Sequence, residues 1–342
     1  MTGHRWRTAV IGLGKVAAGF ADDPVMARHY PYATHAQVLG AHPAFAWDAA
    51  VDVSDAALDV ARRRWHVRHA VASLDALPDR DAIEVAVIAT PPDVRLEVVE
   101  RLPGLRAVIV EKPIATTIAA AQDFLDHCKR HGVLVQVNLW RRADTLFAAL
   151  AGGRLRELIG APQAAFGVYG NGLANNGTHM IDFVRMLLGE VDAVQTLAGV
   201  APSAAGPIAG DVDVAFALRI RGGIACALSP VRFAHYRENG LDVWGERGRL
   251  SILQEGLDVR VFPREPNRAM QDEHEIASDR PQPLASTVGD AFFRLYDNVA
   301  ATLAGDAELC SSGESALRTA RVVEAVLASA ARDGALIHPE SG

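Results

Sequence analysis

Alternation between short apolar segments and segments of helical composition in the first 140 residues constrains the fold most. The apolar segments are residues 7–12, 44–52, 82–90, 106–110 and 133–140, and the helical segments between them include residues 57–65, 94–102 and 118–132. Short apolar runs are typical of strands buried on both faces, and their alternation with helices is typical of a parallel, doubly wound sheet. We therefore predict an α/β domain of this kind over residues 1–142.

The ends of the predicted strands carry glycine or polar residues. Gly12, Asp52, Thr90, Glu111 and Asn138 lie at or close to the carboxyl ends of the five predicted strands. Because ligands bind outside the carboxyl ends of strands in such sheets, these residues predict one ligand-binding edge.

The first strand runs into GLGKVA (12–17), the G-x-G-x-x-A form of a dinucleotide fingerprint. Gly12 would allow the tight turn, and Gly14 would let a pyrophosphate approach the backbone. Ala17 would let the following helix pack closely, and the N-terminus of that helix would face the phosphates. The motif is weak alone, but its place after a strand predicts a dinucleotide site.

Asp52 ends the second strand, where a carboxylate can accept hydrogen bonds from the adenosine ribose and repel a 2′-phosphate. We therefore predict NAD rather than NADP. Asp52 lies 38 positions after Gly14 (52 − 14), whereas roughly 20 are usual. We place the excess in a loop, residues 22–34, inserted after a short helix. This loop is either a solvated excursion or a flap near the cofactor that carries His29, Tyr30 and Tyr32.

Glu111 and Lys112 follow the apolar run 108–110, and Pro113 then ends the strand because it has no N–H to donate. Charges in such a place are costly unless they are paired or used. Lys112 either pairs with a carboxylate at the edge or takes part in chemistry there.

Composition excludes several classes of protein. The chain has 342 residues, enough for two domains, with 50% apolar residues, 22% charged residues and a formal net charge of -7. We therefore expect no nucleic-acid partner. We also expect no membrane span and no secretory signal. Three widely spaced cysteines predict a reducing cytoplasm, and no metal site is expected.

The chain resembles the Gfo/Idh/MocA family of NAD(P)-dependent oxidoreductases. The resemblance is carried by AVIGLGKVAAG (9–19), ATPPDV (89–94), VIVEKPIATT (108–117), VNLWRRAD (137–144), NNGTHMIDFVRMLLGE (175–190), LDVWGERGRLSI (241–252) and ALRTARVVEAVLASA (316–330). It implies a Rossmann domain followed, over residues 143–342, by an α/β domain with a large open, mostly antiparallel sheet. That sheet would include segments 164–170, 193–199, 213–220 and 224–231, and would bind substrate and another subunit.

By this resemblance, Lys112 stands next to the nicotinamide and the reacting carbon, where a cation stabilises a developing alkoxide. His179 is the second catalytic candidate. Asn175 occupies a position that is acidic in many relatives, so acid/base work would fall on His179 and Lys112. Asp182, one helical turn after His179, would hold its imidazole. Arg95 stands where many relatives have histidine, and we assign it no role.

The resemblance implies an NAD-dependent enzyme that moves hydride to or from a carbinol carbon of a sugar, cyclitol or nucleotide sugar, as a cytoplasmic homodimer or homotetramer. An NAD-using glycosidase and a non-catalytic NAD-binding sensor are the alternatives. Predicted substrate contacts are Asn175, Arg142, Tyr169 and Asp182. Predicted cofactor contacts are Gly12, Gly14, Lys15, Val16, Asp52, Thr90, Pro91, Glu111, Lys112 and Asn138.

Overall fold

The computed structural model describes residues 4–203 and 206–339, which divide into two units. Unit 1 comprises Met1–Asp144 and Gly289–Leu317, and unit 2 comprises Thr145–Val288 and Arg318–Gly342. The predicted division at residue 142 left residues 289–317 in the second domain. Their place in unit 1 has a packing reason, because helix α8 (Ala291–Ala304) buries Phe292, Leu295 and Val299 in the core of the N-terminal sheet.

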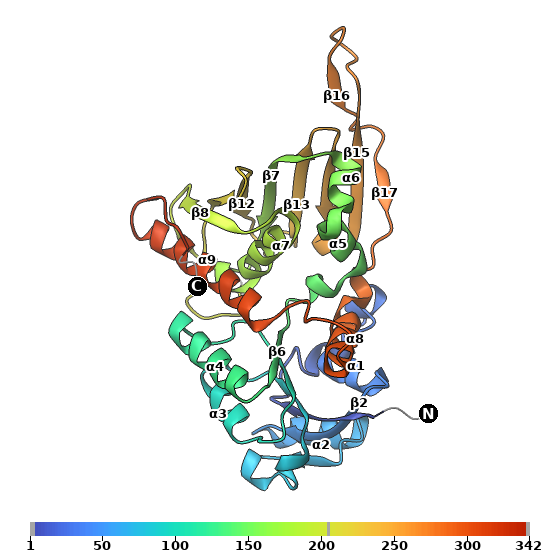
Figure 1. Cartoon of the computed structure of the whole chain (residues 1–342), viewed down its shortest axis with the longest axis vertical. Helices are drawn as coiled ribbons and strands as arrows, with labels where there is room; N and C mark the ends of the chain where they lie inside the picture. The colour runs from blue at the N-terminus through green and yellow to red at the C-terminus, as the bar shows by residue number, and fades with distance from the viewer. Residues whose placement is uncertain (1–3, 204–205, 340–342) are drawn as a thin grey trace. The chain divides into compact units, whose positions relative to one another are not determined.

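Unit 1 contains the predicted parallel sheet, in the order β3-β2-β1-β4-β5-β6 (Figure 1). Its strands are β1 (Trp6–Ile11), β2 (Phe45–Val51), β3 (His69–Val71), β4 (Val85–Ile88), β5 (Ala107–Val110) and β6 (Leu134–Val137). Strands β4 and β5 are apolar and buried throughout, and β1 is so over its last three residues, as expected where helices cover both faces of a sheet. This strand order confirms the Rossmann prediction.

Alternate residues of each strand enter two separate cores. One face of the sheet, with Ile88 and Val110, packs against α3 (Arg95–Glu100) and α4 (Ile118–Arg130). The other face, with Val87 and Ile109, packs against α1 (His35–Ala41), α2 (Asp55–Arg64) and α8. Figure 1 shows α1 and α8 side by side, far apart in sequence but next to each other on the sheet.

The helix that should follow the fingerprint is interrupted, and in place of a short α-helix the chain forms a turn and two short 3-10 helices. Residues 15–18 form a turn, followed by the 3-10 helices η1 (Gly19–Asp22) and η2 (Met26–Arg28). The α-helix starts only at His35, capped by the Thr34 side chain. Its first amides bond back across the excursion, His35 N to Val16 O at 3.2 Å and Ala36 N to Ala17 O at 2.8 Å. The extra residues are thus looped out of one helix.

Unit 2 contains the predicted open, mostly antiparallel sheet. In sheet order its strands are β16 (His274–Ile276), β15 (Asp258–Pro266), β14 (Gly248–Leu253), β13 (Gly240–Gly245), β7 (Pro162–Tyr169), β12 (Ala225–Pro230), β11 (Phe216–Ile220) and β8 (Val191–Thr196), with β17 (Gln282–Leu284) paired to β15. The pair β7–β12 is parallel, and β9 (Ala201–Pro202) and β10 (Val212–Asp213) form a separate ribbon.

Helices cover one part of this sheet. The α-helices α5 (Thr145–Ala149), α6 (Leu155–Ile159) and α7 (Thr178–Leu188) lie beside β7, β13 and β14 (Figure 1). A π-helical turn, η8 (Leu173–Gly177), leads directly into α7, which presents His179 in its first turn. The last helix along the described chain is α9 (Gly313–Ala330). Among the described residues, none of the helices is both long and apolar enough to cross a membrane.

Candidate functional site

The carboxyl edge of the unit 1 sheet brings the predicted cofactor residues together. Gly12 follows β1 with a φ of +87°, a conformation that favours glycine, and a Cβ there would lie 3.0 Å from the backbone of Ala89. A Cβ on Gly14 would meet nothing within 4 Å. The space over Gly14 therefore fits the close approach of a ligand to the backbone, which is the role the fingerprint assigns to this glycine.

Asp52 is fixed between the fingerprint loop and helix α2. Its carboxylate accepts hydrogen bonds from Leu13 N at 2.6 Å and from Ser54 N at 2.8 Å, and Ser54 in turn caps α2. Each carboxylate oxygen has lone pairs beyond the one that these amides use. The geometry suits a diol that donates to an immobile carboxylate.

Two polar atoms at the same edge have no protein partner within the described residues. They are Thr90 Oγ1 and Asn138 Oδ1, and both are buried. Buried polar atoms are normally hydrogen-bonded, and each exception calls for a water, an ion or a ligand. A bound dinucleotide is a group that could satisfy them, so the residues present fit an NAD molecule at this edge.

Glu111 lies at the centre of a buried hydrogen-bond network. Its Oε1 is 2.6 Å from Asn138 Nδ2 and 3.0 Å from His35 Nε2, and His35 Nδ1 is 2.6 Å from Tyr296 Oη. Burial disfavours the Glu111 anion, but the hydrogen bonds from His35 and Asn138 outweigh it and hold the pKa of this carboxyl below its usual value. Sequence reasoning found Glu111 and Asn138 but missed His35 and Tyr296, which come from α1 and α8.

Arg95 braces the turn that carries Lys112, and leaving it without a role was wrong. Its side chain is buried and donates to the carbonyl oxygens of residues 111, 113 and 114 and, at 3.0 Å, of Thr90. Burial lowers the pKa of its guanidinium to about 10, so it remains a cation at neutral pH. Arg95 thereby ties the end of β4 to the turn after β5.

The remaining polar candidates of unit 1 surround the same edge. Arg142 lies in η6 (Trp140–Ala143), directly after β6, and the guanidinium of Arg141 stacks over Trp140 at 4.5 Å. Tyr30 of the looped-out segment contacts the same Trp140 ring edge-on, with ring centroids 6.2 Å apart. The loop is therefore packed against the element that carries Arg142.

In unit 2, the start of α7 is held by carboxylates that the sequence did not predict. Asp211 accepts hydrogen bonds from Ala174 N at 2.9 Å and from Asn175 N at 3.1 Å, and Asp213 accepts from Gly172 N at 3.0 Å. These contacts fix the turn from which Asn175 and His179 project. The sequence pattern gave no signal for them, because residues 211 and 213 are distant along the chain.

Two predicted substrate residues of unit 2 are buried in structural contacts. Tyr169 is fully buried and donates from its hydroxyl to Val214 O at 2.6 Å. Asp182 is 2% exposed and accepts from the Thr319 hydroxyl at 2.9 Å, while Arg185 lies 3.5 Å away. The roles of Asn175 and His179 stay predictions, and the contacts of Tyr169 and Asp182 listed above lie within unit 2.

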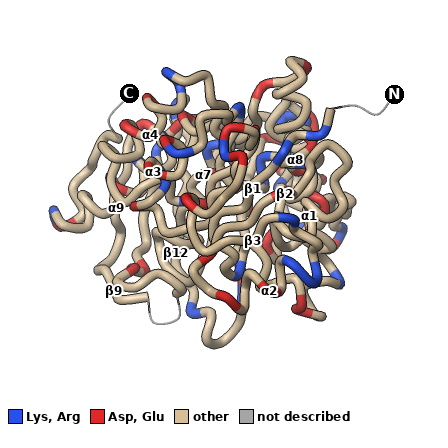
Figure 2. Tube along the Cα trace, turned by 90° about the horizontal axis from the view of Figure 1, so that it is seen from below, with Lys and Arg blue, Asp and Glu red and all other residues tan. Residues whose placement is uncertain are grey.

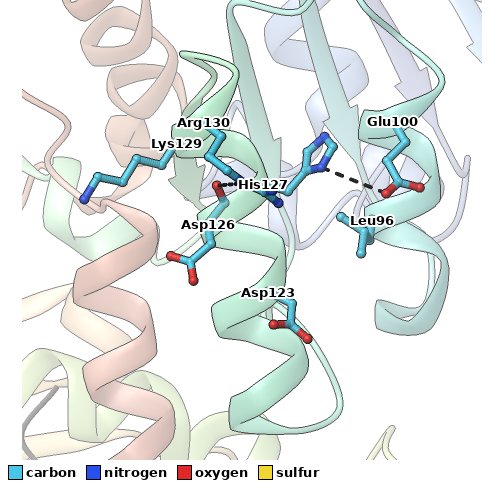
Figure 3. Close-up of a pocket in the computed structure, with 7 residues that line it drawn as sticks. All are labelled: Leu96, Glu100, Asp123, Asp126, His127, Lys129 and Arg130. Carbon is cyan, nitrogen blue, oxygen red and sulfur yellow. Dashed lines mark hydrogen bonds and ion pairs between the residues drawn. The ribbon is translucent and has the colours of Figure 1, made fainter.

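A separate surface cavity lies between α3 and α4. Figure 3 shows its lining, which includes Glu100, Asp123 and His127, with the His127 Nδ1 to Glu100 Oε1 distance at 3.9 Å. The C-terminal end of α4 lies near the edge at which the strands begin, since β6 starts soon after Arg130.

Figure 2 shows acidic and basic residues interspersed along the trace.

Comparisons with known proteins agree with this geometry. A family described as "Oxidoreductase family, NAD-binding Rossmann fold" matches residues 6–139, and "Oxidoreductase family, C-terminal alpha/beta domain" matches residues 162–336. The chain is therefore an NAD-binding oxidoreductase by class. It belongs to the Gfo/Idh/MocA family.

Individual relatives show how far the likeness extends. An inositol 2-dehydrogenase of Acidothermus cellulolyticus is 29% identical over 254 residues, which cover 67% of this chain and 73% of that protein. A levoglucosan dehydrogenase solved with NADH and levoglucosan has a TM-score of 0.76 and 19% identity, covering 99% of this chain and 100% of the other. The WlbA dehydrogenase of Bordetella pertussis, solved with NADH and UDP-GlcNAcA, has a TM-score of 0.74 and 20% identity, with coverage of 99% and 100%. At these identities the two structures establish the fold alone.

Proposed function

We propose that this protein is an NAD-dependent dehydrogenase that acts on a secondary alcohol of a sugar, cyclitol or nucleotide sugar. The single observation that carries the proposal is the carboxyl edge of the unit 1 sheet, where a dinucleotide fingerprint, a fixed Asp52 carboxylate and the Glu111–Lys112 pair converge. The substrate class is supported by the relatives, which are named for inositol and levoglucosan.

Each residue has a distinct role in this proposal. Gly12 and Gly14 let the pyrophosphate reach the backbone, and Asp52 accepts the hydroxyls of the adenosine ribose. NAD, when bound, supplies the acceptor for hydride. Lys112 stabilises the oxygen of the alcohol as negative charge develops on it, and His179 takes up or returns the proton, a task suited to histidine as a residue type because the unperturbed imidazole titrates near neutral pH.

Asn175 sets a limit on this chemistry. An amide can orient a substrate hydroxyl through hydrogen bonds but cannot accept its proton. We therefore assign proton transfer to His179 and substrate orientation to Asn175 and Arg142. We further propose that the protein works in the cytoplasm as a homodimer or homotetramer.

The test is a turnover assay with matched lysine variants. The purified protein is mixed with NAD or NADP and a panel of polyols, sugars and nucleotide sugars, and the absorbance of reduced cofactor is followed. Lys112→Met should lower kcat by about 10³-fold or more, whereas Lys129→Met, in the cavity on α4, should leave it unchanged.

Two other outcomes would redirect the proposal. Turnover that does not depend on Lys112 would contradict the catalytic assignment. NAD binding without any reduction across the panel would favour the NAD-using glycosidase or the non-catalytic sensor. Release of a sugar from a glycoside in the presence of NAD would then distinguish the glycosidase.

A further inference from the structure

Two buried side chains, Tyr296 and His35, form a line that ends at the partly buried carboxylate of Glu111, beside Lys112. Tyr296 of α8 meets His35 of α1, and His35 meets Glu111 at the end of β5, with contact distances of 2.6 and 3.0 Å. His35 and Tyr296 are both 0% exposed. Neither has a role in the proposed function so far, although buried titratable groups next to a reacting lysine are expected to influence it.

The hydrogen bonds link the three side chains in one direction, from Tyr296 through His35 to Glu111. The pKa of Tyr296 is raised well above its usual value, first by burial and then by the negative charge of Glu111, so the phenol stays neutral. Tyr296 O–H can then donate to Nδ1 of His35, while Nε2–H of His35 donates to the Glu111 carboxylate.

The backbone fixes His35 in this place. It is the first residue of α1, capped by Thr34, and its amide bonds to Val16 O across the looped-out segment. Its ring also packs edge-on against Phe292, with centroids 4.8 Å apart. The imidazole therefore has little freedom to leave Glu111.

Other charged and polar groups face Glu111 as well. Asn138, after β6, donates to the same Oε1, while Arg95 of α3 donates to the Glu111 carbonyl oxygen. The positive charges of Arg95 and Lys112 both interact with the carboxylate. Glu111 is thus surrounded by donors and cations on each packed side, with His35 supplying the contact from α1.

We propose that His35, held by Tyr296, is a positioning residue that acts on Lys112 through Glu111. By donating to the carboxylate, it keeps Glu111 ionised and in one orientation, and this fixed anion keeps the neighbouring lysine in its ammonium form. The inference rests on the proposed function only in that Lys112 there needs a positive charge to stabilise the alkoxide.

The sequence offers an unusually clean way to observe Lys112. The chain contains three lysines, Lys15, Lys112 and Lys129. Reductive methylation with ¹³C-formaldehyde labels their amines, and NMR follows the titration of each one. Lys112→Arg assigns the Lys112 signal. Because no substrate is needed, the titration stands apart from the turnover assay, so the failure of either one is distinguishable from the failure of the other.

Four variants test the chain of contacts. Glu111→Gln, nearly isosteric, and His35→Leu should move the Lys112 midpoint to lower pH by about one unit. His35→Gln keeps an N–H donor at a similar reach and should restore most of the shift. The matched control is His42→Leu, because His42 is a second buried imidazole between α1 and α8 that bonds Asp297, 3.1 Å away, and not Glu111. It should leave Lys112 unchanged.

The outcomes are decisive in both directions. A shift in Glu111→Gln and His35→Leu, restored by His35→Gln, supports the proposal. An unchanged Lys112 midpoint in Glu111→Gln overturns it, and so does an equal shift in His42→Leu, which would mean that any loosening of α1 has the same effect. If His35→Leu fails to fold, His35→Met, which also lacks an N–H donor, takes its place.

Discussion

The carboxyl edge of the unit 1 sheet and the start of helix α7 in unit 2 both carry predicted catalytic residues, but they use buried polar groups differently. In unit 1 the buried network converges on Glu111, next to Lys112. In unit 2 the buried groups hold the backbone: Asp211 binds the amides of the turn before α7, and Asp182 lies among Thr319 and Arg185. Buried polar residues therefore contact a neighbour of a predicted catalytic residue in unit 1, whereas in unit 2 they support the local backbone and one another.

The largest expected effect is on the stability of unit 2. Asp182→Ala should lower the free energy of unfolding by about 3–5 kcal/mol, because it leaves the buried guanidinium of Arg185 with one carboxylate fewer. Chemical denaturation followed by circular dichroism measures the loss. Asp192→Ala, which removes a half-exposed partner of Arg221, is the control and should cost under about 1 kcal/mol.

The same variant sharpens the comparison through cofactor binding. NAD affinity at a temperature where Asp182→Ala is folded should stay close to that of the parent protein, since Asp182 belongs to unit 2. A loss of NAD affinity in Asp182→Ala would contradict the division of labour between the two units.

The next largest effect is a difference in stability between alanine variants of two fingerprint glycines, Gly12 and Gly14. Gly12→Ala should destabilise unit 1 by about 1–3 kcal/mol and abolish NAD binding, because φ is +87° and the new Cβ would lie 3.0 Å from Ala89. Gly14→Ala should change stability by less than about 0.5 kcal/mol, since its Cβ meets nothing within 4 Å. It should nevertheless weaken NAD binding, measured by calorimetry. Full NAD affinity in Gly14→Ala would place the pyrophosphate elsewhere.

A smaller effect concerns cofactor choice. Asp52→Ala should reduce the ratio of NADP to NAD dissociation constants about tenfold, because it removes the carboxylate that binds the ribose diol and repels a 2′-phosphate. The ratio is the useful quantity, since damage to the loops at Leu13 and Ser54 affects both cofactors alike. Asp48→Ala, on the same strand and paired with Arg7, should leave the ratio unchanged.

The smallest effect is a difference in acid sensitivity between the units. Burial lowers the pKa of His42, although the negative charge of Asp297 acts to raise it. Below about pH 6.5 the unfolded chain therefore binds a proton that the folded chain does not. Unit 1 should therefore lose stability as pH falls from about 6.5 toward the lowered pKa. In unit 2, the pKa of Glu190 is lowered despite burial, by the Arg185 hydrogen bond and charge, so its contribution is lost only below about pH 4.5.

Hydrogen exchange resolved by mass spectrometry checks this sign for each unit separately. Between pH 6.5 and 5, after correction for intrinsic exchange, helices α1 and α8 should lose protection before α7 does. His42→Leu should remove that early loss. Equal loss in both units would mean that His42 does not set the acid response.

The sequence predicted unit 1 well because its signals are local. A buried parallel strand reads as a continuous apolar run, and the residue that ends it lies at the ligand-binding edge whatever its neighbours are. Gly12, Asp52, Glu111 and Asn138 were found in this way. His35, Arg95 and Tyr296 were not, because each reaches Glu111 or its turn from a helix whose place depends on tertiary packing.

Unit 2 was harder to predict because more of its contacts depend on tertiary packing. Strand segments such as 164–170 and 213–220 were located, but the sequence could not tell a buried Tyr169 from one that lines a pocket. Helical spacing placed Asp182 one turn from His179. It gave no sign of Thr319, a residue of α9 whose hydroxyl donates to the Asp182 carboxylate. Contacts of this kind depend on which distant elements meet.

The central claim is that the carboxyl edge of unit 1 binds NAD with its nicotinamide beside Lys112. A crystal structure of the protein with NADH tests it most directly. We expect the pyrophosphate over Gly12 and Gly14, the adenosine ribose on Asp52, and the nicotinamide ring in contact with the Lys112 side chain. A dinucleotide bound in the opposite orientation, or with its nicotinamide away from Lys112, would refute the proposed cofactor site.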